Sequence, residues 1–232
     1  MSTQDEEKRQ VGVAAAERVR SGMALGLGSG STVYFFLQEL GRRISQGLDV
    51  TGIPTSDRTA ALAREFHIPL TSFDERQELD LAVDGADEVD PNLNLIKGHG
   101  GALLREKIIA RAARQLVIVV DGTKLSSALG TNMTLPVEVL PFACRLAQKR
   151  LSDLGTKTTL READGKPFVT DNGNWILDCG LQPVTDPARL EAEINAIPGV
   201  IENGLFIGLA SEVIVARSGS IEVLVSSRQT GS

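Results

Sequence analysis

The sequence has only two cysteines and two histidines among its 232 residues, and none of these residues cluster. Cys144 and Cys179 are far apart, form no CxxC pair and have no group of histidines nearby. This pattern argues against a metal site and against a disulfide framework, and it favours reduced thiols in the core. We therefore expect no bound metal and a cytoplasmic location.

Long apolar runs and basic blocks are also missing. No segment is apolar over the roughly 18 residues that a membrane span requires. The polar N-terminus does not resemble a secretory signal. With 30 acidic and 24 basic residues the formal net charge is -6. Neither nucleic acid nor a membrane is therefore an expected partner, and an anionic substrate would have to be bound by local groups.

Residues 1–130 alternate short apolar runs with helical patterns, which is typical of a parallel sheet wrapped by helices. Ser56 is well placed as the N-cap of one of these helices. We predict an α/β fold with an open, doubly wound, mostly parallel sheet and helices on both faces. Its strands are expected at 23–27, 49–53, 80–83 and 115–120, and its helices at 32–40, 57–66 and 102–113.

The pattern changes after Gly130, where a second unit is expected. Asp171-Asn172-Gly173-Asn174 favours a hairpin turn between strands at 168–170 and 175–178. Asp186-Pro187 favours the start of a helix that runs to about Ala196. A helix at 142–154 and β-like runs at 136–139 and 158–161 complete this part.

Two last strands, at 212–216 and 221–226, are expected to return to the first unit. We predict a large α/β catalytic domain at residues 1–130 and 206–232 and an inserted small α+β domain at residues 131–205. The tail at 227–232 is expected to be loose.

A glycine-rich loop at 26–32 joins the first predicted strand to the first predicted helix. Its glycines allow a tight turn, and the helix N-terminus with the hydroxyls of Ser29, Ser31 and Thr32 favours a phosphate. Taken alone, the loop fits an ordinary serine-capped turn equally well. A dinucleotide fold is disfavoured, because its pattern needs a glycine at Ser31 and an acidic residue at the end of the second strand.

Asp84 and Asp87 follow the apolar run 81–83 and so lie where a buried strand ends. Open α/β sheets bind their ligands at this edge. Neighbouring carboxylates can separate each other's protonation states, which suits one acid and one base near neutral pH. An Asp-Gly pair is also common in plain turns, so this pair needs support from its surroundings.

Lys97 and Glu106 supply that support. Lys97 precedes a glycine-rich turn at 98–101 whose backbone N–H groups can approach a ligand closely. A glutamate at such a helical position usually lies at the surface. We expect Leu104, Ile108 and Ala112 to form the apolar line of this helix and Glu106 to face a cleft on another side.

Lys124 follows the next strand, so several strand ends deliver polar groups to one edge of the sheet. A shared pocket for proton transfer on an anionic substrate explains this better than separate turns do.

The order of these motifs is more specific than any one of them. The motifs are GSGST at 28–32, DGADE at 84–88, IKGHGGALLREKI at 96–108, DGTKL at 121–125, PVEV at 136–139, VTDNGNWILD at 169–178 and INAIPGV at 194–200. Together they resemble ribose-5-phosphate isomerase type A over most of the chain.

This resemblance implies that ribose 5-phosphate and ribulose 5-phosphate are interconverted through an enediolate in the non-oxidative pentose phosphate pathway. It implies Glu106 as the general base, Asp84 in ring opening and hydroxyl proton transfer, Asp87 in shaping the pocket and Lys97 in stabilising the oxyanion. No cofactor and a homo-oligomer, either dimer or tetramer, are also implied. The implied substrate-binding residues are Ser29, Gly30, Ser31, Thr32, Asp84, Gly85, Ala86, Asp87, Lys97, Gly98, His99, Gly100 and Lys124.

His99 departs from the family, which usually has glycine at this position. If the position needs a positive φ, histidine is strained there. We expect its ring to be a bystander rather than a ligand.

A protein of this predicted architecture can have three other functions: a sugar-phosphate sensor that binds without reacting, acyl-CoA transfer or amino-sugar phosphate deamination. The sequence shows no DNA-binding segment for a sensor. The paired DGADE and KGHGG motifs argue against the two other reactions.

Overall fold

The computed structural model of the protein describes residues 3–217 and 219–225, and their contacts divide the chain into two compact units. The first unit contains the described residues up to Ala86, Arg105–Lys124 and the described residues from Leu209 on. The second unit contains Asp87–Leu104 and Leu125–Gly208. It therefore includes residues 87–104, which the sequence prediction grouped with the large domain. Whether domains with the predicted boundaries fold independently stays a prediction.

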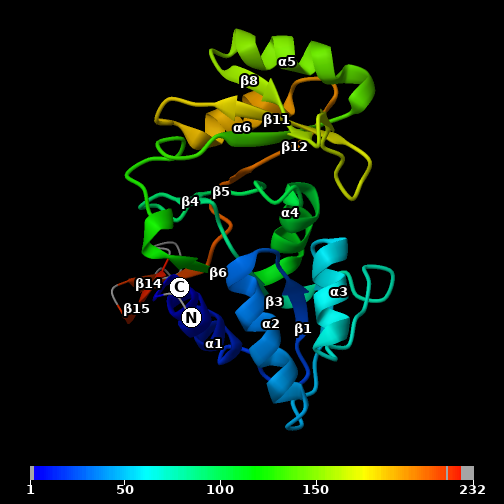
Figure 1. Cartoon of the computed structure of the whole chain (residues 1–232), viewed down its shortest axis with the longest axis vertical. Coiled ribbons are helices and arrows are strands. Elements are labelled where there is room, and N and C mark those ends of the chain that lie inside the picture. Colours follow the sequence, from blue (N-terminus) through cyan, green and yellow to red (C-terminus); the bar gives the residue numbers. More distant parts are fainter. Residues whose placement is uncertain (1–2, 218, 226–232) are drawn as a thin grey trace. The chain divides into compact units, whose positions relative to one another are not determined.

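A six-stranded sheet in the order β15-β14-β6-β3-β1-β2 forms the centre of the first unit (Figure 1). All neighbouring strands are parallel except β14 and β15, which are antiparallel. The prediction of an open, mostly parallel sheet is confirmed. The strands are β1 (Ala24–Leu27), β2 (Thr51–Pro54), β3 (Leu79–Asp84), β6 (Ala113–Asp121), β14 (Glu212–Arg217) and β15 (Ser220–Val225).

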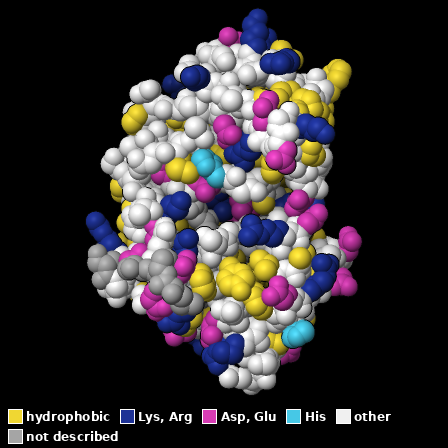
Figure 2. All heavy atoms as spheres, in the orientation of Figure 1, with side chains coloured by type: hydrophobic (Ala, Val, Ile, Leu, Met, Phe, Trp, Pro, Cys, Tyr) yellow, Lys and Arg dark blue, Asp and Glu magenta, His cyan; other side chains and the backbone are white. Residues whose placement is uncertain are grey.

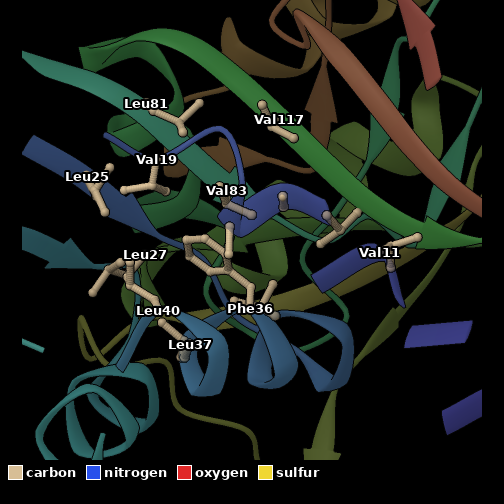
Figure 3. Close-up of a cluster of buried hydrophobic side chains, with 14 of the residues drawn as sticks. Val11, Val19, Leu25, Leu27, Phe36, Leu37, Leu40, Leu81, Val83 and Val117 are labelled. Atoms are coloured by element: carbon tan, nitrogen blue, oxygen red, sulfur yellow. The ribbon is translucent and has the colours of Figure 1, made fainter. Parts of the chain in front are cut away.

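Helices cover both faces of this sheet. The helices of this unit are α1 (Thr3–Ala16), α2 (Ser31–Ile44), α3 (Asp57–Glu65) and α4 (Leu103–Ala112), which begins in the second unit. Figure 3 shows the apolar cluster on one face, where Phe36 and Leu40 of α2 meet Leu27 of β1. On the other face a Cβ at Gly26 would lie 2.4 Å from Cγ2 of Ile109, so α4 packs directly against β1 there.

The sequence explains why α2 forms and where α3 begins. Buried α2 residues recur at Val33, Phe36, Leu37 and Leu40, the spacing of a single helical face. Ser56 caps α3 as predicted, because its hydroxyl accepts a hydrogen bond of 3.0 Å from the Thr59 N–H.

The sequence reading did not anticipate α1, because the N-terminal segment begins with a run of polar and charged residues. Val11 and Ala15 of this helix are nevertheless fully buried. Gly12 allows α1 to approach α2 closely, since a Cβ there would lie 2.7 Å from the Phe36 nitrogen. The packing of α1 on α2 therefore decides the helix, rather than the polarity of its first turn.

The second unit contains a four-stranded antiparallel sheet in the order β12-β7-β11-β8. Its strands are β7 (Leu135–Val139), β8 (Lys157–Leu160), β11 (Trp175–Gly180) and β12 (Val200–Asn203). Helices α5 (Cys144–Asp153) and α6 (Pro187–Asn195) pack on this sheet (Figure 1). Asp186 caps α6 through a 3.1 Å hydrogen bond from the Arg189 N–H, as the Asp-Pro pair predicts.

Short strands, none of them predicted, complete the second unit. A three-stranded sheet joins β4 (Glu88–Val89), β5 (Leu95–Ile96) and β13 (Leu205–Phe206). A hairpin joins β9 (Glu162–Ala163) to β10 (Lys166–Pro167). Short 3-10 helices lie at Gly122–Lys124 in the first unit and at Pro141–Ala143 in the second.

One strand prediction in this unit is wrong. The turn at Asp171–Asn174 forms, with the Thr170 N–H donating to the Asn174 carbonyl at 2.9 Å. Residues 168–170 are not a strand, however, because they contribute only the single bridge between Val169 and Trp175. The neighbours of strand β11, which begins at Trp175, are β7 and β8 instead. The predicted loose tail at 227–232, and Ser226 of the last predicted strand, lie outside the described residues.

Candidate active site

Three neighbouring strands of the first unit end at the same edge of the sheet, and polar groups follow each of them. The loop Gly28–Thr32 follows β1, Asp84 ends β3, and Lys124 follows β6. The carboxyl edge of a parallel sheet is where α/β proteins bind ligands. The structure therefore brings these predicted site residues to one edge.

The Asp84 carboxylate holds the loop after β1. Its Oδ1 accepts hydrogen bonds from the Ser29 N–H at 3.0 Å and from the Gly85 N–H at 2.8 Å. A Cβ at Gly28 would lie 2.3 Å from this oxygen, so only glycine permits the close approach. Asp84 is 3% exposed, so the two amide bonds fix its carboxylate inside the protein.

A cluster of four hydroxyl groups surrounds the same loop. Ser29 Oγ lies 2.7 Å from Thr55 Oγ1, 2.9 Å from Ser56 Oγ and 3.0 Å from Thr59 Oγ1. The sequence analysis gave Ser56 the role of an N-cap, but it gave neither Thr55 nor Thr59 a role in the site. The available signal was a run of hydroxyl residues after β2. The cluster fixes the shape of the glycine-rich loop.

The N-terminus of α2 presents backbone donors next to this loop. Gly30 precedes the helix with φ 117°, a conformation that favours glycine. The first intrahelical bond runs from the Tyr34 N–H to the Gly30 carbonyl, so the N–H groups of Ser31 and Thr32 have no intrahelical acceptor. Such a terminus suits an anion, as the sequence analysis proposed.

Glu106 lies in the first turn of α4 and is 5% exposed. The predicted helix face is wrong. Ile108 is 47% exposed, whereas Leu103, Lys107 and Ala110 are buried at the spacing of one face with Glu106. The glutamate is therefore on the inward side of the helix. Its burial excludes the usual outcome at such a position, in which Glu106 would be a solvated surface residue.

Lys124 closes a short 3-10 helix that is fixed by Asp121. The Thr123 N–H donates to Asp121 Oδ1 at 3.0 Å, and the Thr123 hydroxyl donates to the same oxygen. Burial alone would raise the pKa of Asp121, but the bonds from Thr123 and Gln4 and the charge of Lys124 outweigh it and lower the pKa. Asp121 is therefore an anion that sets the turn, and Lys124 is half-buried beyond it.

The second unit carries Lys97 and its glycine-rich turn. Lys97 is 3% exposed, and its Nζ lies 5.5 Å from the centroid of the Phe206 ring. Its N–H donates to the Gly204 carbonyl at 2.9 Å, and a Cβ at Gly204 would lie 2.2 Å from the Lys97 carbonyl oxygen. The strand pairing of β5 with β13 thus fixes the backbone at this lysine.

Asp87 and His99 meet within the same unit. The His99 N–H donates to Asp87 Oδ2 at 3.0 Å. The His99 ring Nε2 lies 2.9 Å from the Thr134 carbonyl oxygen. The residues of this loop with positive φ are Gly98 (106°) and Gly101 (85°), so His99 itself is not in a strained conformation. A structural contact for its ring fits the bystander interpretation.

The DGADE motif also contains a structural residue, Glu88, to which the sequence analysis assigned no role. Glu88 is fully buried, and its carboxylate accepts hydrogen bonds from the N–H groups of Gly130 at 2.7 Å and Asn132 at 2.9 Å. It therefore anchors the segment that leads into β7.

In the described residues, no three or more His, Cys, Asp or Glu side chains form a group able to hold a metal ion. Nor does that part of the chain contain a helix suited in length and hydropathy to crossing a bilayer.

Comparisons with known proteins identify the family. Residues 51–220 match the family described as Ribose 5-phosphate isomerase A (phosphoriboisomerase A). The chain belongs to the ribose 5-phosphate isomerase A family. It is 51% identical over 224 residues to Ribose-5-phosphate isomerase A 1 of Oceanobacillus iheyensis, covering 96% of this chain and 100% of that protein. It is 52% identical over 214 residues to the Ribose-5-phosphate isomerase A of Gloeobacter violaceus, covering 92% of this chain and 93% of that one.

Solved structures of ribose 5-phosphate isomerases share the fold. The enzyme of Methanocaldococcus jannaschii aligns with a TM-score of 0.91 at 42% identity, over 95% of this chain and 99% of that one. A D-ribose-5-phosphate isomerase in complex with phospho-erythronic acid aligns with a TM-score of 0.94 at 42% identity, over 97% of this chain and 100% of that one. The predicted α/β fold and the predicted family are confirmed.

Proposed function

We propose that the protein interconverts D-ribose 5-phosphate and D-ribulose 5-phosphate as an aldose–ketose isomerase of the non-oxidative pentose phosphate pathway. The observation that carries the proposal is the burial of Glu106, at 5% exposure, in a chain that belongs to this family over nearly its whole length. A buried carboxylate on a helix is expensive to maintain unless it has a role.

The reaction requires one carbon-bound proton and one hydroxyl proton to move. In the open-chain aldose, the Glu106 carboxylate removes the proton from C2, and the C1 carbonyl becomes part of an enediolate. The Glu106 carboxyl group exchanges its proton with water and then protonates C1, and transfer of the O2 proton to O1 gives the ketose. The step is redox-neutral and needs no cofactor.

The remaining residues act on the oxygens. Asp84 opens the sugar ring and relays the hydroxyl protons, with its geometry fixed by the Ser29 and Gly85 amides. Lys97 stabilises the negative oxygen of the enediolate by its charge. Asp87 orients the loop after Lys97 through the His99 N–H.

The phosphate is the handle by which the substrate is held. Its partners are the N-terminus of α2 with Ser29–Thr32, Lys124, and the backbone of Gly98–Gly100. Gly85 and Ala86 line the path between Asp84 and Asp87. A relative at 42% identity was solved in complex with phospho-erythronic acid, a sugar acid phosphate whose carboxylate has the shape and charge of an enediolate.

Cysteine chemistry and surface charge support the proposed cellular location and the proposed class of partner. The free, buried thiols of Cys144 and Cys179 support a cytoplasmic location. On the face shown in Figure 2, acidic and basic side chains are interspersed, which supports a small-molecule substrate over nucleic acid or a membrane. We expect the working form to be a homo-oligomer, either a dimer or a tetramer.

The direct test incubates the purified protein with ribose 5-phosphate in the presence of a chelator and measures ketose formation. Turnover is expected. In Glu106→Gln we expect kcat to fall by about 10²–10⁴-fold, because the general base is lost while the binding groups stay. Affinity for phospho-erythronic acid, measured by calorimetry, should be retained.

Glu78→Gln is the matched control, since Glu78 is a surface carboxylate whose side chain is 78% exposed and paired with Arg114. Its kcat should equal that of the wild type. Binding of the sugar phosphate by wild-type protein without any turnover would refute the proposal and point to a sensor.

A further inference from the structure

The carbonyl groups of the turn after Lys97 converge on one guanidinium. Arg161, directly after β8, donates from Nη1 to the Gly98 carbonyl at 3.1 Å and to the His99 carbonyl at 3.0 Å. Both bonds lie within the second unit. A single nitrogen thus fixes two consecutive peptide groups of the glycine-rich turn.

Arg161 is itself held rigidly. Its Nε and Nη2 donate to the two oxygens of Asp178 at 2.9 and 2.5 Å, and its side chain is only 14% exposed. Its guanidinium carbon lies 5.8 Å from the centroid of the Phe168 ring. The bidentate pair with the Asp178 carboxylate fixes the plane of the Arg161 guanidinium, and it therefore fixes the direction in which Nη1 donates.

The same clamp determines where the N–H groups of the turn point. In a trans peptide the carbonyl and the N–H point in opposite directions. The Gly98 carbonyl faces Arg161, and the His99 N–H correspondingly reaches Asp87 Oδ2 at 3.0 Å. The His99 carbonyl also faces Arg161, so the Gly100 N–H is directed away from it. That N–H makes no hydrogen bond to the described residues.

Phe168 supports the end of the turn. A Cβ at Gly101 would lie 2.5 Å from Cζ of the Phe168 ring, so the ring packs directly against this glycine. The Phe168 N–H donates to the Arg161 carbonyl at 2.9 Å, and the Arg161 N–H donates to the Ile176 carbonyl at 2.8 Å. The backbone on both sides of the β9–β10 hairpin is thus tied to the clamp.

We propose that Arg161, braced by Asp178, is a positioning residue for the isomerase: it holds the His99 N–H on Asp87 and orients the Gly100 N–H toward the substrate phosphate. This inference rests on the proposed function. Lysine cannot replace Arg161, because a single ammonium cannot bind two carbonyl groups and both oxygens of a carboxylate in one plane. No other role in the reaction has been assigned to either residue.

The test measures kcat and KM for ribose 5-phosphate in Arg161→Lys and Arg161→Ala. We expect KM to rise by about tenfold or more, the effect of misdirecting one hydrogen bond to a charged group, with a smaller fall in kcat. The inhibition constants of inorganic phosphate and phospho-erythronic acid should rise in parallel. Added guanidinium ion should lower KM for Arg161→Ala but not for wild-type enzyme.

This signature separates positioning from mere stability. A variant that only folds less completely has less active enzyme, which lowers the apparent kcat at an unchanged KM. Arg189→Ala is the control, because Arg189 is 75% exposed and paired only with Glu193 at the surface. Both of its constants should match those of the wild type.

Asp178→Asn provides a second variant that leaves the Arg161 side chain in place. It should raise KM in the same direction but by less, and it keeps the test valid if Arg161→Ala does not fold. An unchanged KM together with unchanged inhibition in folded Arg161→Lys would overturn the proposal. Absence of turnover in wild-type protein would refute the proposed function instead, and calorimetric binding of phospho-erythronic acid would still test the clamp.

Discussion

At the scale of residues, the three proposed catalytic groups Asp84, Lys97 and Glu106 are all buried, as is the structural carboxylate of Glu88. Asp84 and Lys97 are each 3% exposed and Glu106 is 5% exposed. Charged side chains are rarely buried to this extent unless they are paired, because removing a charge from water is costly. Each of the three lies in a motif that the sequence had already singled out. Burial and the motif together, rather than burial alone, therefore support a functional role.

The thiol of Cys179 supplies a pH prediction at the same scale. Burial raises the pKa of this thiol to about 11 from its usual 9.0. A raised pKa in the folded state stabilises the protein fully below pH 9, and this contribution is lost as the pH rises toward 11. At about 1.4 kcal/mol for each pH step between the two values, the loss amounts to roughly 2–3 kcal/mol.

The measurement is the free energy of unfolding in urea between pH 8 and pH 11. The wild type should lose more stability over this range than Cys179→Ala, which lacks the titrating group. Comparing the two proteins removes the contribution of the lysines and of Tyr34. Identical pH slopes for the two would show that the thiol does not titrate in this way.

The sequence predicted most of the candidate site residues but not the direction of each side chain. Asp84, Lys97 and Glu106 could be found because strand ends and glycine-rich turns mark them. The inward face of α4 could not be found, because apolar residues such as Leu103, Leu104, Ile108 and Ile109 occur on several sides of that helix. A helix without one apolar stripe gives no signal of its orientation.

At the scale of elements, a glycine in the sheet sets the position of α4. Gly26 of β1 faces this helix, and a Cβ there would lie 2.4 Å from Cγ2 of Ile109 and 2.8 Å from the Ala82 Cβ. Strand β1 is paired on both sides, with β3 and with β2, so its backbone cannot move away easily. Because α4 carries Glu106, the distance between helix and sheet also determines the position of the general base.

Gly26→Ala should therefore destabilise the protein by about 1–3 kcal/mol through overpacking, and it should lower kcat. Ile109→Ala alone should also destabilise it, by leaving a cavity. In the double variant the methyl group at position 26 fills part of that cavity, so its destabilisation should be less than the sum of the two. Urea unfolding of the four proteins checks this, and strict additivity would mean that the two side chains are not in contact.

Elements with strong local signals were predicted well, and those that depend on distant partners were not. Ser56 and Asp186-Pro187 mark helix starts through their own chemistry. Strands β4, β5 and β13 have only two residues each, and they exist because β5 pairs both with the nearby β4 and with β13 from a distant part of the sequence. Residues 168–170 show the converse, since the neighbours of strand β11, which begins at Trp175, are β7 and β8 instead.

At the scale of the whole molecule, the α/β class followed from the alternation of apolar runs with helical patterns, and the family followed from the order of motifs along the chain. The order of the strands did not, because β6 lies between β3 and β14 although it follows β3 by a long connection. Only the tertiary structure shows that β1, β3 and β6 are neighbours and that their polar ends lie on one edge. The predicted domain boundaries and the predicted homo-oligomer stay predictions.

Glu106 is the proposed base that moves a proton between neighbouring carbons of the sugar phosphate. The most direct measurement runs the reaction to equilibrium in D₂O and locates deuterium by NMR in the ribose 5-phosphate and ribulose 5-phosphate. An enediolate formed by a carboxylate base predicts solvent deuterium at C2 of the aldose and C1 of the ketose, with exchange lost in Glu106→Gln. Conversion to the ketose without deuterium at either carbon would contradict the account, because hydrogen would then move directly between the carbons.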